Sequence, residues 1–64
     1  MFKAGDFVIL NNRVGVVTRT GNDLGEQMED HTEVWFGTFD KGLPEVFSIP
    51  TEYISVGPQA VKKH

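Results

Sequence analysis

The sequence predicts a small all-β protein whose five short strands close into a barrel. Apolar and β-branched residues gather in five runs, at residues 6–11, 14–20, 32–39, 45–49 and 54–56. Glycine, asparagine, aspartate and proline separate the runs, as expected for turns between strands. The runs are too short and lack the period for helices. Closure is expected because an open sheet of this size would leave two exposed edges and too little core.

The run at 32–39 is the expected centre of the sheet, because it holds the only tryptophan and two of the five phenylalanines. Aromatic and β-branched side chains fit a pleated, half-buried surface. Alternation places one set of side chains on one face: Thr32, Val34, Phe36 and Thr38. The other face receives Glu33, Trp35, Gly37 and Phe39. Neither face is wholly polar, so both are expected to be partly covered.

The other runs differ in their details. Gly15 lies inside the second run, which indicates a bulge or a close approach of two backbones. Pro50 precedes the last run and predicts a short 3₁₀ turn over residues 50–53. The expected core comprises Val8, Leu10, Val16, Val34, Phe36, Val46, Phe47, Ile49 and Ile54.

Length and composition limit the architecture to one domain, expected over residues 1–57, with a flexible C-terminal tail over 58–64. The chain has no cysteine, which excludes disulfides and zinc sites with cysteine ligands. Compact packing or a partner must therefore supply the stability.

No apolar run approaches the roughly 18 residues of a membrane-spanning helix, and the N-terminus lacks signal-peptide features. We therefore expect a cytoplasmic protein.

Charge is distributed unevenly along the chain. The net charge is −3, but residues 21–45 contain seven carboxylates against a single base, Lys41. The seven are Asp23, Glu26, Glu29, Asp30, Glu33, Asp40 and Glu45. Nucleic-acid binders approach phosphate through lysine and arginine, so this balance argues against that class.

The acidic connection at residues 21–31 is expected to be a long, mobile loop that becomes ordered on binding, since its like charges repel. Leu24 and Met28 are its only apolar residues, and they could contact a partner. The alternative is that they fold back as a lid over an open end of the barrel. The acidic set with His31 lacks the EF-hand spacing, so no metal and no cofactor are predicted.

Three short motifs resemble those of SH3-like small β-barrels, the group that includes SH3, KOW, CarD and PsaE-type domains. Gly5-Asp6 precedes an apolar strand, Val14-Gly15-Val16-Val17 resembles the second strand, and Ile49-Pro50-Thr51-Glu52-Tyr53-Ile54 resembles the stretch that closes SH3 domains. The resemblance implies a five-stranded SH3-like barrel over roughly residues 5–56. The chain lacks the Ala-Leu-Tyr-Asp-Tyr-like strand of true SH3 domains, and it has fewer basic residues than RNA-binding KOW domains.

In SH3 domains, residues corresponding to Trp35, Pro50 and Tyr53 line a groove for a polyproline II ligand, and the alternative is that they only pack the barrel. His31 and His64 accompany no recognisable nucleophile, so the chain is expected not to be an enzyme.

We expect a protein-interaction module or accessory subunit whose partner has a basic or proline-rich surface. Its expected contact residues are Trp35, Pro50, Tyr53, Leu24, Met28, Glu26, Glu29 and Asp30. The alternative is a nucleic-acid-binding barrel of the KOW or cold-shock type, which would use Arg13, Arg19 and Lys3.

Overall fold

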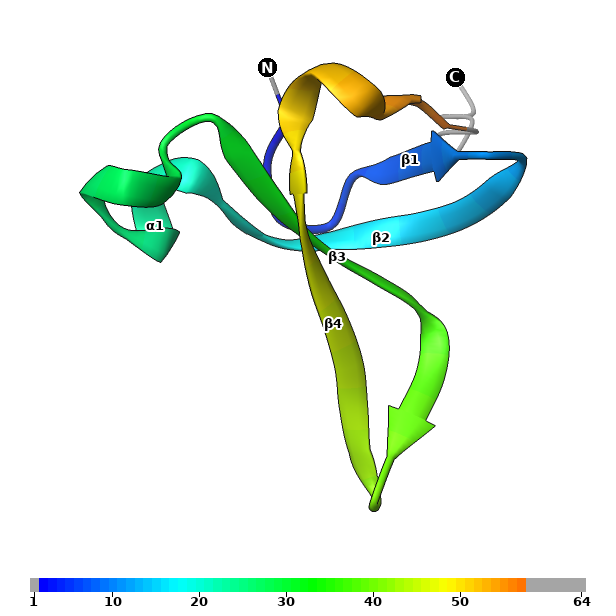
Figure 1. Cartoon of the computed structure of the whole chain (residues 1–64). Helices are drawn as coiled ribbons and strands as arrows, with labels where there is room; N and C mark the ends of the chain where they lie inside the picture. Colours follow the sequence, from blue (N-terminus) through cyan, green and yellow to red (C-terminus); the bar gives the residue numbers. More distant parts are fainter. Residues whose placement is uncertain (1, 58–64) are drawn as a thin grey trace, which may run out of the picture.

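The computed structural model describes residues 2–57, apart from the side chain of Glu26, and shows an all-β protein (Figure 1). Five strands form one antiparallel sheet in the order β4-β3-β2-β1-β5. The strands are β1 (Phe7–Leu10), β2 (Arg13–Thr20), β3 (His31–Asp40), β4 (Leu43–Pro50) and β5 (Ser55–Val56). The prediction of five strands at these places is confirmed. The expected tail at 58–64 lies outside the described residues.

The prediction of a closed barrel is wrong. In residues 2–57, β4 has only β3 as a strand neighbour, and β5 has only β1. β5 is two residues long, and the β3–β4 hairpin extends well away from the other strands (Figure 1). The two ends of the sheet are therefore joined by side chains and not by a hydrogen-bonded ladder, since Ile49 of β4 and Ile54 before β5 belong to the same core cluster.

The core lies on one face of the coiled sheet, called here the inner face. Its buried apolar side chains are Val8, Val17, Val34, Ile49 and Ile54, and Phe2, Leu10 and Phe36 pack against them. Four of the expected core residues are thus confirmed as buried, and Leu10 and Phe36 are half-buried. The expectation was wrong for Val46 and Phe47, which are 39% and 41% exposed because they lie where the hairpin leaves the core.

The expectation was also wrong in β2, where Val17 is buried and Val16 is only half-buried. Val8 is buried and lies opposite Gly15 in the register, so Gly15 and Val17 share the inner face. Gly15 makes the predicted close approach, because a Cβ there would meet side-chain atoms of Val34 and Phe36. The register shift comes later, between Val17 and Arg19. It leaves Thr18 as an extra residue, as in a β-bulge.

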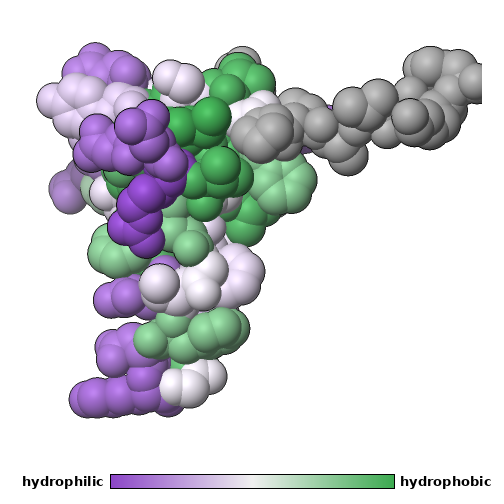
Figure 2. Space-filling model, turned by 90° about the vertical axis from the view of Figure 1, so that its right-hand side faces the viewer, coloured by the Kyte–Doolittle hydropathy of each residue, from purple (hydrophilic) through white to green (hydrophobic). Residues whose placement is uncertain are grey.

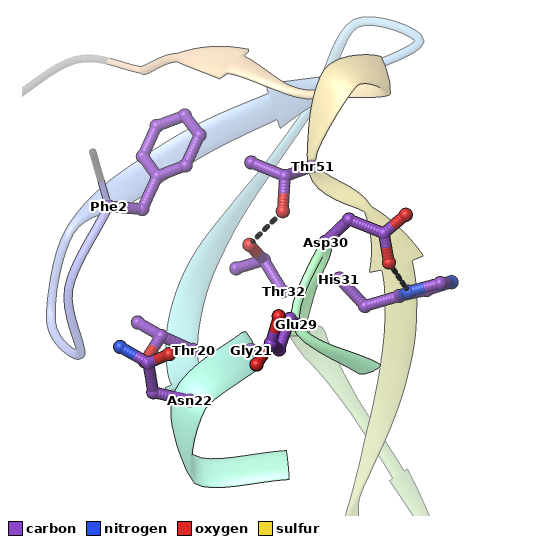
Figure 3. Close-up of a pocket in the computed structure, with 9 residues that line it drawn as sticks. All are labelled: Phe2, Thr20, Gly21, Asn22, Glu29, Asp30, His31, Thr32 and Thr51. Carbon is purple, nitrogen blue, oxygen red and sulfur yellow. Dashed lines mark hydrogen bonds and ion pairs between the residues drawn. The ribbon is translucent and has the colours of Figure 1, made fainter. Parts of the chain in front are cut away.

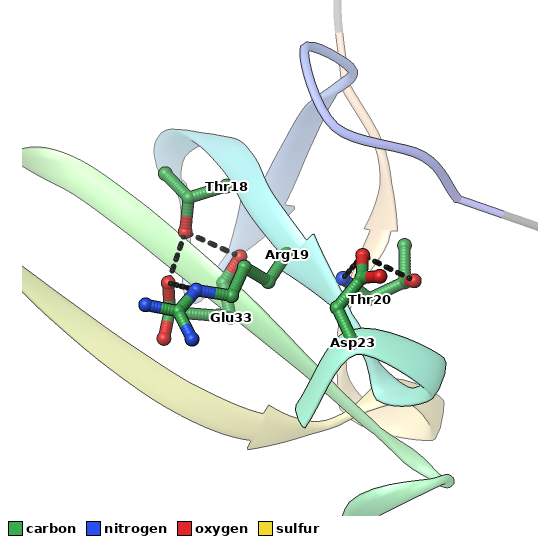
Figure 4. Close-up of polar contacts among 5 residues, drawn as sticks. All are labelled: Thr18, Arg19, Thr20, Asp23 and Glu33. Atoms are coloured by element: carbon green, nitrogen blue, oxygen red, sulfur yellow. Dashed lines mark hydrogen bonds and ion pairs between the residues drawn. The ribbon is translucent and has the colours of Figure 1, made fainter. Parts of the chain in front are cut away.

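The connection between β2 and β3 is not the open acidic loop that the sequence predicts. It contains a single helical turn, α1 (Gly21–Leu24), and a 3₁₀ turn, η1 (Glu26–Met28). The Asp23 carboxylate accepts hydrogen bonds from the backbone N–H and the hydroxyl of Thr20, at 3.5 and 3.3 Å (Figure 4). Leu24 and Met28 are half-buried, which agrees better with the alternative that they fold back onto the body. The predicted turn after Pro50 is confirmed as η2 (Thr51–Tyr53).

Within the described residues, no helix has the length and apolar character needed to cross a membrane.

Candidate functional site

The face of the sheet opposite the core, called here the outer face, carries a continuous row of apolar side chains. The register aligns Phe7 with Val16, Val16 with Trp35, and Trp35 with Val46. Directly opposed residues on neighbouring strands share a face, so these four side chains form one row across β1, β2, β3 and β4. Each of them is at least partly exposed. We call this set the apolar row.

A shallow groove lies beside the row. Its volume is about 170 Å³, and it is lined by Phe7, Val14, Gly15, Val16, Trp35, Phe36 and Gly37. Phe39 extends the apolar surface, because its ring meets Trp35 edge-on with the centroids 5.5 Å apart, and it is 63% exposed. In the space-filling view, hydrophobic residues gather in the upper part of the molecule, whereas hydrophilic residues follow the left side down to the tip of the hairpin (Figure 2).

The indole of Trp35 is held in place by the chain itself. Its Nε1 donates a 2.7 Å hydrogen bond to the carbonyl oxygen of Thr38. Between Trp35 and Phe39 the β3–β4 register shifts, and Gly37 within this stretch has a φ of 90°. This irregularity brings Thr38 back towards the ring. Because the N–H is already bonded, the ring can offer a partner an apolar surface but not a donor.

The three residues of the expected polyproline groove are not adjacent in the structure. Pro50 lies opposite His31, four residues along β3 from Trp35, which corresponds to roughly 13 Å. Glu33 and Ser48 form a pair between the two positions. Tyr53 follows in η2 and is 63% exposed. Neither Pro50 nor Tyr53 lines the groove beside Trp35.

The basic residues of the nucleic-acid alternative do not form a common patch. The Arg13 guanidinium lies over the ring of Phe36, 4.8 Å from its centroid, on the inner side of the sheet. Arg19 lies on the outer face, with its Nε 3.5 Å from Oε1 of Glu33. That carboxylate also accepts a 2.7 Å hydrogen bond from the Thr18 hydroxyl (Figure 4). Lys3 is exposed near the N-terminus, where its backbone N–H donates to Asp6.

A second cavity, of about 330 Å³, lies at the end of the sheet next to α1 (Figure 3). It is lined by Phe2, Thr20, Gly21, Asn22, Glu29, Asp30, His31, Thr32 and Thr51. It therefore includes two expected contact residues, Glu29 and Asp30. Leu24 and Met28 do not line it, and the side chain of Glu26 is not described.

Two polar pairs lie at this cavity. The hydroxyls of Thr32 and Thr51 are 2.8 Å apart, and Thr32 is buried. Nδ1 of His31 lies 2.8 Å from Oδ1 of Asp30. Figure 3 shows the His31 ring directed away from the two hydroxyls. The arrangement therefore does not place a base next to a hydroxyl nucleophile.

Three carboxylates of the acidic segment have separate local partners. Asp23 bonds to Thr20, Asp30 to His31, and Glu33 to Thr18 and Arg19. Among the residues that the structure describes, no group of three histidine, aspartate or glutamate side chains is arranged to hold a metal ion.

Comparison of the chain with protein-family models, with curated proteins and with solved structures gives no match. The assessment of the site therefore depends on the geometry described above.

Sequence reasoning identified Trp35 in the apolar row but missed Phe7, Val16 and Val46 as surface residues. The partners in the row are separated by 9 to 19 positions along the chain, and only the strand register aligns them. One signal was present: the runs at 7–10 and 14–17 are apolar at consecutive positions, apart from Gly15, so each must place apolar groups on both faces.

Proposed function

We propose that this protein is a non-catalytic protein-interaction module, suited to be a small accessory subunit, and that it binds its partner through the apolar row and the adjoining groove. The three short motifs that resemble those of SH3-like barrels, together with the 3₁₀ turn after Pro50, are the basis for proposing a relationship to that group, with the sheet left open.

The observation that carries this proposal is the continuity of the apolar row. Single exposed apolar residues are common on soluble proteins, whereas contiguous patches mark binding surfaces. Here four strands each contribute one apolar side chain to one line, and Phe39 adds a second exposed aromatic ring beside Trp35. Aromatic side chains held rigidly near the centre of a surface are typical anchors of protein interfaces.

The charge of the surrounding segment indicates the chemistry of the partner. Next to Trp35 on the outer face, Glu33 is only 15% exposed and is paired with Arg19, so the two side chains add little net charge there. Glu45 precedes Val46 in β4, so alternation places it on the inner face, where it accepts a hydrogen bond from Thr38. The segment 21–45 as a whole is strongly acidic. An apolar segment flanked by lysine or arginine would match this surface, and its association would be faster at low ionic strength.

A peptide library selected on the immobilised protein tests the proposal. We expect selected peptides with an apolar centre and basic flanks, and at least about a tenfold loss of affinity on Phe39→Ala or Trp35→Ala. Tyr53→Ala is the matched control, since Tyr53 and Phe39 are both aromatic and both 63% exposed. Equal losses for Phe39→Ala and Tyr53→Ala, with both variants folded by circular dichroism, would refute the proposed surface.

The nucleic-acid alternative is addressed by a gel shift at low salt with RNA and single-stranded DNA. Arg13 and Arg19 lie on opposite sides of the sheet, so they do not form one binding surface. We therefore expect no salt-dependent gel shift that depends on both arginines. A shift that Arg13→Gln and Arg19→Gln weaken equally would favour the nucleic-acid alternative.

A further inference from the structure

The outer strand β4 presents a long edge without a second strand neighbour in residues 2–57. It is eight residues long, whereas the strand at the opposite edge, β5, has two. Proteins commonly protect such edges with lysine, bulges or short strands. Between Pro44 and Pro50, β4 has no lysine, and Val46 and Phe47 are 39% and 41% exposed on its two faces. This edge is therefore suited to pairing with another strand.

The hydrogen bonds show which backbone groups of β4 face outwards. The Thr51 N–H donates to the Asp30 carbonyl at 2.8 Å, one step beyond the His31–Pro50 pair. Because hydrogen-bonded and non-hydrogen-bonded pairs alternate in an antiparallel ladder, the backbone groups of Pro50, Ser48 and Val46 point away from β3. Starting from the Asp40–Leu43 pair that closes the hairpin turn, the same alternation places Pro44 outwards.

The two prolines thus occupy outward positions, where a proline costs no ladder hydrogen bond. The outward N–H donors left between them are those of Val46 and Ser48. This set is self-complementary. If a second copy lies antiparallel with Phe47 at the twofold axis, Val46 faces Ser48 of the other copy, and each pair exchanges two hydrogen bonds. Pro44 then faces Pro50, so the pairing leaves no N–H donor without an acceptor.

Side chains and charges agree with a second copy as the occupant. Phe47 lies on the inner face, where its ring is 6.1 Å from that of Phe36. The twofold would bring both such pairs together and bury their exposed edges. Glu45 would face Ile49, so no like charges would be opposed. The hairpin tip with Lys41 would lie next to η2 with Glu52, and both side chains are exposed in the single chain.

We propose that two copies of this chain associate through β4 in this register, giving a continuous ten-stranded antiparallel sheet. The apolar row stays accessible on the outer face, so this association is independent of the proposed partner binding. With only two outward donors in each copy, the dimer should be weak, with a dissociation constant in the range of roughly 10–100 µM.

Sedimentation or light scattering over a concentration series tests the association. The wild-type mass should rise from 7.2 kDa towards twice that value. Ser48→Pro removes an outward donor without affecting the β3 ladder, and it should raise the dissociation constant at least about tenfold. Ser48→Ala keeps the backbone donor and is the matched control. A wild-type protein that stays monomeric up to about 1 mM, or equal effects of the two variants, would overturn the proposal.

The register has a separate test that does not depend on the proline variant. Because the chain has no cysteine, Phe47→Cys introduces a single thiol, which would face its own copy at a non-hydrogen-bonded pair with a Cα separation of about 4.5 Å. Mild oxidation should then give a disulfide-linked dimer. Phe39→Cys, on the other face of the same hairpin, should not cross-link. Equal cross-linking of both variants, or none with Phe47→Cys, would show that this register is wrong.

Discussion

At the scale of single residues, Gly21 shows how closely the segment before β3 packs against the end of β2. It is buried, and a Cβ at this position would overlap the backbone carbonyl of Glu29. The obstacle is backbone, so it cannot rotate away as the end of a long side chain could. The need for glycine here is set by a residue eight positions later, and no local sequence pattern reveals it.

We therefore expect Gly21→Ala to lower the free energy of unfolding by about 1–3 kcal/mol, because α1 would have to move away from Glu29. Urea denaturation provides the measurement. Asn22→Ala is the neighbouring control at an exposed position and should change stability by less than about 0.5 kcal/mol. A Gly21→Ala variant as stable as the control would show that the two segments are not held together.

A second residue-scale prediction concerns adjacent valines in β2. Val17 is 2% exposed in the core, whereas Val16 lies half-buried in the apolar row. Val17→Ala should therefore cost about 2 kcal/mol of stability, and Val16→Ala clearly less. Thermal or urea unfolding of the two variants gives the comparison. If Val16→Ala were the more damaging change, the assignment of inner and outer faces in β2 would be reversed.

This pair also shows a limit of sequence reasoning. The stretch Val14–Val17 is apolar at every position except Gly15, so its pattern contains no alternation from which a face could be read. The structure decides through Gly15, whose missing side chain leaves room for Val34 and Phe36 on the inner face. By contrast, the alternation predicted for residues 32–39 places Thr32 and Val34 on one face, and both are buried, Val34 as an expected core residue.

At the scale of elements, the strands were predictable and their connections were less so. The segment after β2 carries several carboxylates, and charge repulsion alone predicts an extended loop. In the structure Asp23 instead acts as a local acceptor for Thr20, and the Met28 N–H bonds to the carbonyl of Gly25. Local hydrogen bonds of this kind, with Leu24 and Met28 half-buried, favour the folded turns. The apolar row was not predictable, since cross-strand register depends on these connections.

The hairpin between β3 and β4 gives an element-scale prediction. Lys41 and Gly42 form its two-residue turn with φ values of 53° and 83°, as a type I′ turn requires. Asparagine tolerates positive φ better than lysine, so Lys41→Asn should stabilise the protein by about 0.5 kcal/mol. Gly42→Ala should destabilise it by about 1 kcal/mol. Urea midpoints measure both, and a stabilising Gly42→Ala would contradict this turn assignment.

At the scale of the whole molecule, the core and the hairpin are distinct regions. The outer half of the β3–β4 hairpin extends beyond the five buried core residues (Figure 1). The sequence predicts a barrel because it shows strands of suitable number and length. It does not show that β5 has only two residues and that β4 continues past the core.

The extended hairpin should open without unfolding of the core. The Val17 N–H bonds to the carbonyl of Asp6 within the body, and its side chain is buried, so its exchange should require global unfolding. The Asp40–Leu43 pair lies at the hairpin tip, where Phe39 and Leu43 are 63% and 70% exposed. Few buried contacts resist separation of the strands there. The Leu43 amide should therefore exchange through a local opening of lower free energy.

Native-state amide exchange in low concentrations of denaturant distinguishes the two routes. Exchange of Leu43 should hardly depend on denaturant, because little surface is exposed when the tip opens, whereas exchange of Val17 should follow the slope of global unfolding. The Ser48→Pro variant is the appropriate background, since pairing of β4 with a second copy would protect the hairpin. If Leu43 and Val17 gave the same free energy and the same slope, the hairpin would be part of one cooperative unit with the core.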